Sequence, residues 1–461
     1  MTFLRGLLAA RGHLAFLVGL VLAFLTIRAV DRRTRPPPAR AAPTASAAAE
    51  RELPLRAPVP ALDARDRALA EAAWRYLERN TDPATGLARA VRGHPVTTMW
   101  EVGSQLMAIL AAEDLALVSR RGASERLRRA LASLARIPLD EEGGLPSKAY
   151  DTRTLALVTY DGHPSARGLG WSALDVARVL GALSAATWKH PEHAAAARAA
   201  VSRWHLAELT DGAALRGATR GPDGVLRRYQ EGRLGYEQLA AKSLLGWGLP
   251  VGPLLDYGAH TSVTQVNGQP VPQDDRRPRE HGEARAPTLS EPWILDALEN
   301  GLDAVTLPAT RAILLAQARR FTGTGRLTAV SEDHLDRAPW FAYSSIVDGD
   351  DLWSARTPEG VPARDAFCFS SKAAVGWAAI FEGSYPERLA EAAAALVVPG
   401  EGVLAGAYDD GTPNRALALN TNAVVLEALA YRVRGPARAA ATAPGPPPGP
   451  ALAPARAEAR R

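Results

Sequence analysis

The sequence predicts an all-α domain over residues 61–433, an (α/α)6 toroid of six helical hairpins with a small β-hairpin insert. Two observations lead to this prediction. A Gly/Leu motif recurs at a long, variable interval, and each copy stands between two contrasting helical patterns. The interval between the third and fourth copies is nearly twice the others and therefore spans two units, which makes six. The copies are Gly86-Leu87, Gly144-Leu145, Leu215-Arg216-Gly217, Gly325-Arg326-Leu327 and Gly402-Val403-Leu404.

The two helices of each unit differ in composition. The first is amphipathic with a polar face, and such helices are expected at residues 66–79, 124–136, 193–208 and 310–321. The second is rich in Ala, Ser, Leu and Gly, and these helices are expected at residues 101–112, 172–187, 236–247, 292–300, 371–381 and 422–431. A helix that is apolar around most of its girth must be buried on most sides, so the second set forms an inner ring and the first an outer ring.

The fourth unit departs from this pattern because no outer helix is evident in it. Residues 261–273 instead predict a β-hairpin that turns at Asn267-Gly268. Such an insert either borders a functional site or is a loop without a role, and both interpretations stay open.

The two ends of the chain differ from the domain. Residues 1–60 predict one N-terminal membrane-anchor helix and a Pro/Ala-rich linker. The apolar stretch, residues 14–27, is shorter than the about 20 residues of a usual span, but Arg11 and Arg28 can snorkel and lengthen it. We therefore favour an uncleaved anchor over a signal peptide. Residues 434–461 form an Ala/Pro/Arg tail that is expected to be disordered.

Charge and cysteine content exclude several functions. The formal net charge is +5, but arginines at the two ends supply the excess and the domain itself is mildly acidic, which argues against a nucleic-acid partner. The only cysteine, Cys368, rules out an intrachain disulfide and a cysteine-based zinc site, and we expect it to be buried. No phosphate loop, dinucleotide fingerprint or H-E-x-x-H motif is present, so no metal and no cofactor are expected.

The long loops that lead from outer to inner helices carry acids next to aromatic residues. Carboxylates can act as general acid or base, and Trp and Tyr offer flat faces for sugar rings. The predicted catalytic residues are Glu101, Asp175, Glu231, Glu237 and Glu291. The predicted substrate-binding residues are Trp100, Lys148, Asp151, Arg153, Trp171, Tyr229, Arg233, Tyr236 and Trp293. We expect Glu231 or Glu237 to be the general acid, and one of the other three acids to be the base or to hold the sugar.

Each of these residues also has a structural interpretation. Acids in the first turn of a helix commonly cap its amides and complement its dipole. Asp175 either pairs with Arg178 or faces the cavity. Lys148, Asp151 and Arg153 either bind substrate or form a salt-bridge network.

A further motif offers an alternative. Asp348-Gly349-Asp350-Asp351 matches the D-x-D-D pattern with which class II terpene cyclases protonate polyenes. A short acidic run beside Gly is more often a solvated turn or a cation-binding loop. A terpene-cyclase-like enzyme that uses Asp350 is therefore a minor alternative.

Several sequence segments resemble the bacterial domain-of-unknown-function 3131 family, over residues 63–431. They include Thr-Thr-Met-Trp-Glu at 97–101 and Tyr-Gln-Glu-Gly-Arg-Leu-Gly-Tyr at 229–236, with further segments at residues 73–77, 81–87, 148–154, 170–175 and 290–293. The resemblance implies a six-hairpin glycosidase-like fold and a glycan-handling envelope protein. It supplies no substrate and no catalytic residues.

The function predicted from these features is that of a glycoside hydrolase or transglycosylase with a glycan substrate. The alternative is a non-catalytic glycan-binding or scaffold protein of the cell envelope. Arginines after the anchor outnumber those before it, so the positive-inside rule would keep the domain in the cytoplasm, whereas a glycan substrate places it outside. We favour an inner-membrane anchor with a periplasmic domain. The sequence leaves the oligomeric state open.

Overall fold

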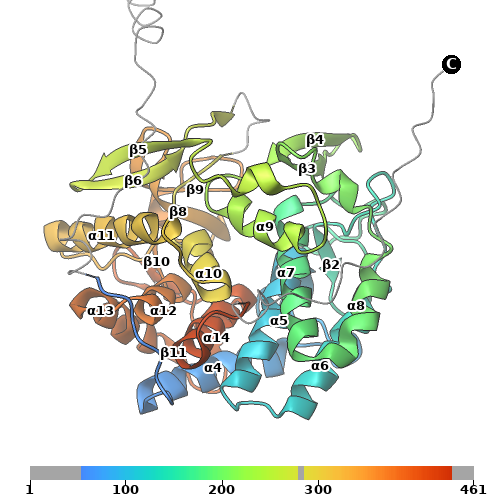
Figure 1. Ribbon diagram of the computed structural model, residues 1–461, viewed down its shortest axis with the longest axis horizontal. Coiled ribbons are helices and arrows are strands. Elements are labelled where there is room, and N and C mark those ends of the chain that lie inside the picture. Colours follow the sequence, from blue (N-terminus) through green and yellow to red (C-terminus); the bar gives the residue numbers. More distant parts are fainter. Residues whose placement is uncertain (1–52, 279–284, 439–461) are drawn as a thin grey trace, which may run out of the picture. The chain divides into compact units, whose positions relative to one another are not determined.

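The computed structural model describes residues 53–278 and 285–438. Within them, an inner ring of helices is surrounded by outer elements (Figure 1). The inner helices are α5 (Met99–Asp114), α7 (Ala173–Lys189), α9 (Tyr236–Leu245), α10 (Glu291–Asn300), α12 (Ser371–Ile380) and α14 (Leu419–Arg434). Each contacts the next in chain order, and α14 contacts α5, which closes the ring. The expected inner helices are thus confirmed, with ends that shift by a few residues.

The outer helices carry the polar faces. They are α4 (Ala64–Asn80), α6 (Arg120–Leu134), α8 (Ala194–Val201), α11 (Thr306–Thr324) and α13 (Ser384–Ala394). The third is shorter than predicted, because the chain leaves the helix after Val201 and turns Trp204 into the core, where that side chain is 5% exposed. The fourth unit has β5 (Thr261–Val266) and β6 (Gln269–Asp274) in place of a long outer helix, and the hairpin turns at Asn267-Gly268 as predicted.

The prediction of an all-α fold is nevertheless only partly correct, because the loops into the inner helices contain several small antiparallel sheets. These loops hold short alternating segments that bury one side against the helix starts. The strands are β1 (Val96–Thr98) with β2 (Ala149–Asp151), β3 (Leu215–Arg220) with β4 (Leu226–Glu231), β7 (Glu332–His334) with β8 (Phe341–Asp348) and β9 (Asp351–Arg356), β10 (Cys368–Ser370) with β13 (Gly406–Tyr408) and β14 (Pro413–Asn414), and β11 (Val397–Val398) with β12 (Gly402–Val403).

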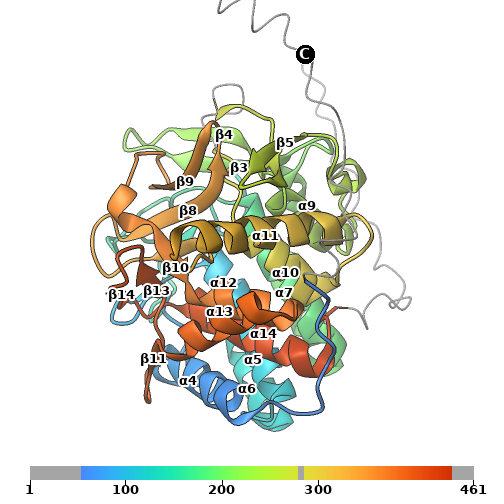
Figure 2. The ribbon, with the colours of Figure 1, turned by 90° about the vertical axis from the view of Figure 1, so that its left-hand side faces the viewer.

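The connections differ between the two faces of the ring. Inner helices pass to outer elements through short turns, whereas the return connections are long and carry the strands. Figures 1 and 2 both draw the β3–β4, β5–β6 and β8–β9 hairpins on the upper side of the domain and the helices α4 and α6 on the lower side. The N-terminal ends of the inner helices therefore meet the long loops on one face.

A charged cluster is buried where the inner helices meet. Arg178 of α7 forms ion pairs with Glu299 of α10 and Glu427 of α14, the second at 2.8 Å. Arg438, after α14, pairs with Glu299 at 2.6 Å and donates to Ser243 of α9. The four charged side chains are buried. Charges are tolerated in such a place only when each is paired, so this cluster ties four inner helices or their extensions together.

Close packing of the ring also depends on a glycine. A Cβ atom at Gly103 of α5 would lie 2.6 Å from Cγ of Arg178 and 2.9 Å from its carbonyl carbon. Because the nearest atoms include backbone, a side chain at this position would push α7 away from α5. Arg178 thus approaches α5 across a position that only glycine can occupy.

Segments at both ends of the described range pack onto the ring. Leu53 is 2% exposed, and Leu55 pairs with Phe381 through an isolated bridge. Within the described part of the chain, no helix has the length and apolar content needed to cross a membrane. The predicted anchor at residues 14–27 and most of the predicted tail lie outside the described residues.

We predict that Arg178→Met lowers the free energy of unfolding by about 3–5 kcal/mol, because it leaves the buried Glu427 carboxylate without its partner. Urea and thermal unfolding of the full chain would measure this. Arg128→Met, at an exposed i,i+3 pair with Glu125, is the matched control and should change the free energy of unfolding far less than Arg178→Met does. A loss no larger than that of the control would show that the buried cluster does not hold the ring.

Candidate functional site

Two of the predicted acids are placed by hydrogen bonds to the N-cap residues of inner helices. Ser172 Oγ accepts the backbone N–H of Asp175 at 3.1 Å and donates to its carboxylate at 2.9 Å. Thr98 caps Glu101 of α5 in the same way. The capping interpretation of both acids is therefore confirmed. It does not exclude a further role, because one carboxylate oxygen of each acid needs no part in the cap.

Asp175 and Glu231 lie beside each other. Glu231, at the end of β4, accepts the backbone N–H of Ala173, while Asp175 bonds to the neighbouring Ser172. Both acids are partly exposed. Lys148 lies close to both; its ammonium donates to Thr219 at 2.6 Å and to the hydroxyl of Tyr229 at 3.1 Å. The structure thus brings together two predicted catalytic acids, one predicted substrate-binding lysine and one predicted tyrosine.

The pKa values of this group follow from crowding of like charges. Burial and the charge of Glu231 raise the pKa of Asp175 to about 7, so it is protonated in slightly acidic solution. Burial also raises the pKa of Glu231, and Lys148 and the N–H of Ala173 offset part of that rise. Burial lowers the pKa of Lys148, and the negative charges of Glu231 and Asp175 offset part of this lowering. Glu231 has the partners that favour a negative charge, so Asp175 is the member of the pair that keeps the proton.

The pKa of Glu101 is lowered, whereas that of Asp175 is raised. The carboxylate of Glu101 lies 3.7 Å from Nε2 of His334 on β7. Although burial alone would raise the pKa of Glu101, the neighbouring His334 imidazole and a hydrogen bond from the Thr98 hydroxyl lower it. Glu101 is therefore an ionised carboxylate on the same face as the protonated Asp175, whose pKa it helps to raise.

A second group of acids surrounds Glu291 at the start of α10. Glu291 is 1% exposed and is paired with Lys372 of α12, and it accepts hydrogen bonds from Ser331 at 3.1 Å and Asn420 at 2.7 Å. With its oxygens occupied, Glu291 has the contacts of a fixed structural charge. Burial and the charge of Glu291 raise the pKa of the neighbouring Glu332 to about 8.

Glu237 and Arg233 lie apart from both groups. Glu237 is 2% exposed and forms an ion pair at 2.7 Å with Arg276, which also binds Asp274 at 2.6 Å. Arg233 is buried and donates to Gln230 and to the carbonyl of Gly232. These contacts give both residues a role in fixing the turn before α9.

The predicted aromatic residues divide into two sets. Trp100 and Tyr236 are partly exposed, and their rings meet edge to face at 5.6 Å beside Arg178, at the centre of the ring. Trp171 is fully buried and donates to the carbonyl of Arg216. Trp293 is 3% exposed, so the last two side chains belong to the core.

Asp151 and Arg153 form a local turn. Asp151 accepts the backbone N–H groups of Arg153 and Thr154 at 2.8 and 2.9 Å, and the Arg153 guanidinium binds it at 3.0 Å. For this pair the salt-bridge interpretation describes the observed contacts.

Four residues at the site were not predicted: Tyr160, Glu332, His334 and Tyr343. Tyr160 is 59% exposed, yet desolvation and the charges of Asp175 and Glu231 raise the pKa of its hydroxyl, which places it beside those acids. The sequence does contain a signal for Glu332 and His334. They belong to the run Ser-Glu-Asp-His at 331–334, which lies in a long loop that leads to an inner helix.

The D-x-D-D motif forms the turn between β8 and β9. Asp348 binds Arg285 at 2.7 Å and Arg356 at 3.0 Å, and Asp350 is exposed at the tip. A terpene cyclase needs its proton donor in the wall of an apolar cavity. The terpene-cyclase alternative is therefore wrong, and the solvated-turn interpretation is confirmed.

Cys368, 1% exposed, is buried as expected.

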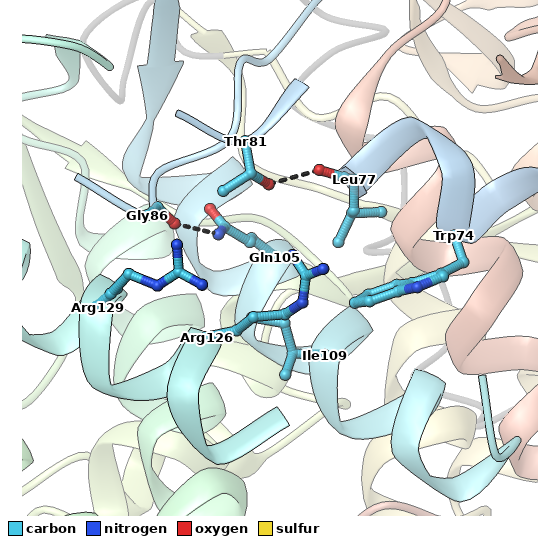
Figure 3. A pocket seen from close by; sticks show the side chains of 8 residues that line it. All are labelled: Trp74, Leu77, Thr81, Gly86, Gln105, Ile109, Arg126 and Arg129. Atoms are coloured by element: carbon cyan, nitrogen blue, oxygen red, sulfur yellow. Dashed lines mark hydrogen bonds between the residues drawn. The ribbon is translucent and has the colours of Figure 1, made fainter. Parts of the chain in front are cut away.

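Figure 3 shows a small cavity between α4, α5 and α6, away from these acids. Its volume of about 10 Å³ holds at most one water molecule. Gln105 donates to the carbonyl of Gly86 at 2.6 Å, and the Arg126 guanidinium lies 4.9 Å from the centre of the Trp74 ring. Its polar groups thus serve internal packing.

Among residues 53–278 and 285–438, one cluster could hold a metal ion. The side-chain ligand atoms of His190, Glu192 and His193 lie within 4.8 Å of one another at the C-terminal end of α7. His190 already contacts Glu113 at 2.6 Å and Glu192 at 3.1 Å. Most of α7 lies between Asp175 and this cluster, which puts them about 22 Å apart, so the cluster has no part in the site described above.

Comparisons with known proteins place the domain among glycosidase-like folds. The model of the family described as "Protein of unknown function (DUF3131)" matches residues 68–435. No curated protein matches the chain by sequence.

Three solved structures share the fold. A Bacteroides caccae protein provisionally named a glucoamylase has a TM-score of 0.59 at 13% identity, over 81% of this chain and 94% of that one. An endo-β-1,2-glucanase from Chitinophaga pinensis has a TM-score of 0.54 at 12% identity, over 81% and 94%. One from Talaromyces funiculosus has a TM-score of 0.52 at 13% identity, over 81% and 84%. At these identities the similarity concerns the fold, a helical toroid of the glycoside-hydrolase type.

We predict that Asp175→Asn stabilises the protein as the pH rises. The folded state keeps this carboxyl protonated up to about pH 7, whereas in the unfolded chain it ionises near pH 3.8, so wild-type stability falls between these values. The variant's gain in melting temperature should therefore grow from pH 4 to pH 7 and then level off. Asp114→Asn, at the far end of the inner ring, is the control and should show no such trend. A gain that is independent of pH would contradict the raised pKa.

Proposed function

The chain belongs to the DUF3131 family, and we propose that it is a glycoside hydrolase or transglycosylase that uses Asp175, Glu231 and Glu101 on a bacterial glycan. The observation that carries this proposal is the cluster of Asp175, Glu231 and Lys148 at the loop-bearing face of a glycosidase-like toroid, where burial and the charge of Glu231 raise the pKa of Asp175 to about 7. The same face offers the ionised Glu101 and partly exposed aromatic side chains.

The proposed reaction is acid–base cleavage of a glycosidic bond. Asp175 gives its proton to the glycosidic oxygen while the bond from that oxygen to the anomeric carbon breaks. Glu101 removes a proton from a water molecule, whose oxygen bonds to the anomeric carbon; in transglycosylation a sugar hydroxyl takes the place of water. Asp175 ends ionised and Glu101 ends protonated, and exchange with solvent restores both.

The assignment of roles differs from the one predicted from the sequence. There, Glu231 or Glu237 was the expected acid. Glu231 accepts a helix N-terminal N–H and lies near Lys148, which favours its ionised form, and its charge raises the pKa of Asp175. Glu231 thus acts through Asp175, as the group that keeps the donor protonated. Glu237 is held in its ion pair with Arg276 and is left out of the proposed reaction.

The substrate class follows from the fold comparison and remains part of the proposal. Two of the similar structures are endo-β-1,2-glucanases, one of them solved with sophorotriose and glucose. A linear β-1,2-glucan is therefore the first substrate to test. We further propose an inner-membrane anchor at residues 14–27 with the domain in the periplasm.

We predict that the full chain produces new reducing ends, or altered chain sizes, from β-1,2-glucan or another glucan of a bacterial panel. Asp175→Asn should reduce the rate by about 10²–10⁴-fold, because it removes the proton donor. Asp114→Asn is the same chemical change at the far end of α5 and should keep wild-type activity. Binding of a glycan without any product would instead support the non-catalytic alternative.

We predict that kcat/KM falls as the pH rises above about 7, because Asp175 must be protonated. In Glu231→Gln the loss of the neighbouring negative charge lowers the pKa of Asp175, so this limb should move to lower pH. Initial rates between pH 4 and pH 9 would measure both. A descending limb that stays in place in Glu231→Gln would contradict the proposed pairing.

A further inference from the structure

One face of the β7–β8 hairpin is partly exposed at the site. The register pairs Glu332 with Tyr343 and His334 with Phe341, so these four side chains point to the same side. All four are partly exposed. The alternate residues, Asp333 and Ala342, are 3% and 2% exposed and point into the core.

The aromatic rings on this face form a continuous row. The rings of His334 and Phe341 meet at 5.1 Å, and those of Phe341 and Tyr343 at 5.5 Å, both edge to face. Such a row leaves ring surface open on the side away from the sheet. The three rings lie on the side of the hairpin that faces away from the core. Packing of the hairpin against the core therefore does not explain why these rings stay partly exposed.

This face is joined to the proposed reaction centre at both ends. His334 lies 3.7 Å from the carboxylate of Glu101. Glu332 lies near the hydroxyl of Tyr236, whose ring contacts Trp100 at 5.6 Å. The row therefore borders the space between the proposed base and the central aromatic pair.

We propose that the exposed face of β7–β8, formed by Glu332, His334, Phe341 and Tyr343, is a sugar-binding subsite of the glycan that the domain cleaves. The proposal rests on the proposed function and adds to it a residue set and a role. A pyranose ring presents C–H groups on its faces and hydroxyls around its edge. Phe341 and Tyr343 meet the faces, and the polar ends of Glu332 and His334 bond to the hydroxyls.

Glu332 has a defined part in this subsite. Burial and the charge of Glu291 keep its carboxyl protonated at neutral pH. A neutral carboxyl both donates and accepts a hydrogen bond, which matches a sugar hydroxyl better than a carboxylate does. In this role Glu332 is a binding residue, and the proton donor to the glycosidic oxygen is Asp175.

The test measures binding apart from cleavage. The full chain that carries Asp175→Asn is titrated calorimetrically with a linear β-1,2-glucan oligosaccharide, and each further substitution is made in that background. Phe341→Ala and Tyr343→Ala should each weaken binding by about five- to tenfold, as expected for the loss of one aromatic contact. Trp188→Ala removes an aromatic side chain that is 45% exposed near the C-terminal end of α7, and it should leave the affinity unchanged.

Two substitutions at Glu332 separate binding from proton donation. Glu332→Gln keeps a neutral group that donates and accepts hydrogen bonds, so it should weaken binding less than Glu332→Ala does. Glu332→Ala should weaken binding about as much as the aromatic substitutions do. Melting temperatures show whether each variant is folded.

The outcomes distinguish this inference from the proposed function. If the wild-type chain cleaves the glucan but the folded Phe341 and Tyr343 variants bind as tightly as the parent, only the subsite is overturned. Loss of turnover with intact binding in Glu332→Gln would also overturn it, because Glu332 would then be the proton donor. If no glucan is bound or cleaved by the wild-type chain, the proposed function itself fails.

Discussion

The pairing of Arg178 with Glu299 and Glu427 is the interaction on which the rest of the structure depends. Each of these groups is almost free of solvent contact, and a lone charge in that position would cost several kcal/mol. The three charges come from α7, α10 and α14, which are far apart in the sequence but share the interior of the ring. In the closed ring each of these charges meets a partner of opposite sign.

Closure of the ring determines where the acids of the site can lie. The inner helices start on the face where the long loops return, so Glu101, Asp175 and Glu291, each in the first turn of its helix, are brought to one side of the domain. The helix dipole and the free N–H groups favour a negative charge at each of these starts. Burial and mutual repulsion act against it. The balance differs at each position: His334 keeps Glu101 ionised, whereas Glu231 keeps Asp175 protonated. One fold thereby raises the pKa of one carboxyl and lowers that of another on the same face.

The small sheets have a separate function in this architecture. The helices alone supply acids and the central aromatic pair, but few exposed surfaces at the mouth of the ring. The β3–β4 hairpin brings Glu231 and Tyr229 to Asp175, and the β7–β8 hairpin brings His334 to Glu101. Alternation along a strand lets one side pack on the helix starts while the other stays open. Short hairpins thus extend the site without disturbing the ring.

The sequence by itself determined the inner and outer helices, the β5–β6 hairpin and the face that carries the site, because these depend on local periodicity, turn residues and loop length. It also identified Asp175, Glu231, Glu101 and Lys148. Only the tertiary structure decided which acids meet. Glu231 and Glu237 are close in sequence, yet one reaches Asp175 and the other is enclosed with Arg276. Trp171 and Trp293 look like Trp100 in their local sequence, but they point into the core. Glu332 and His334 reach the site only through the pairing of β7 with β8. Charge pairing, burial and strand register join residues distant along the chain, and a local pattern contains no information about them.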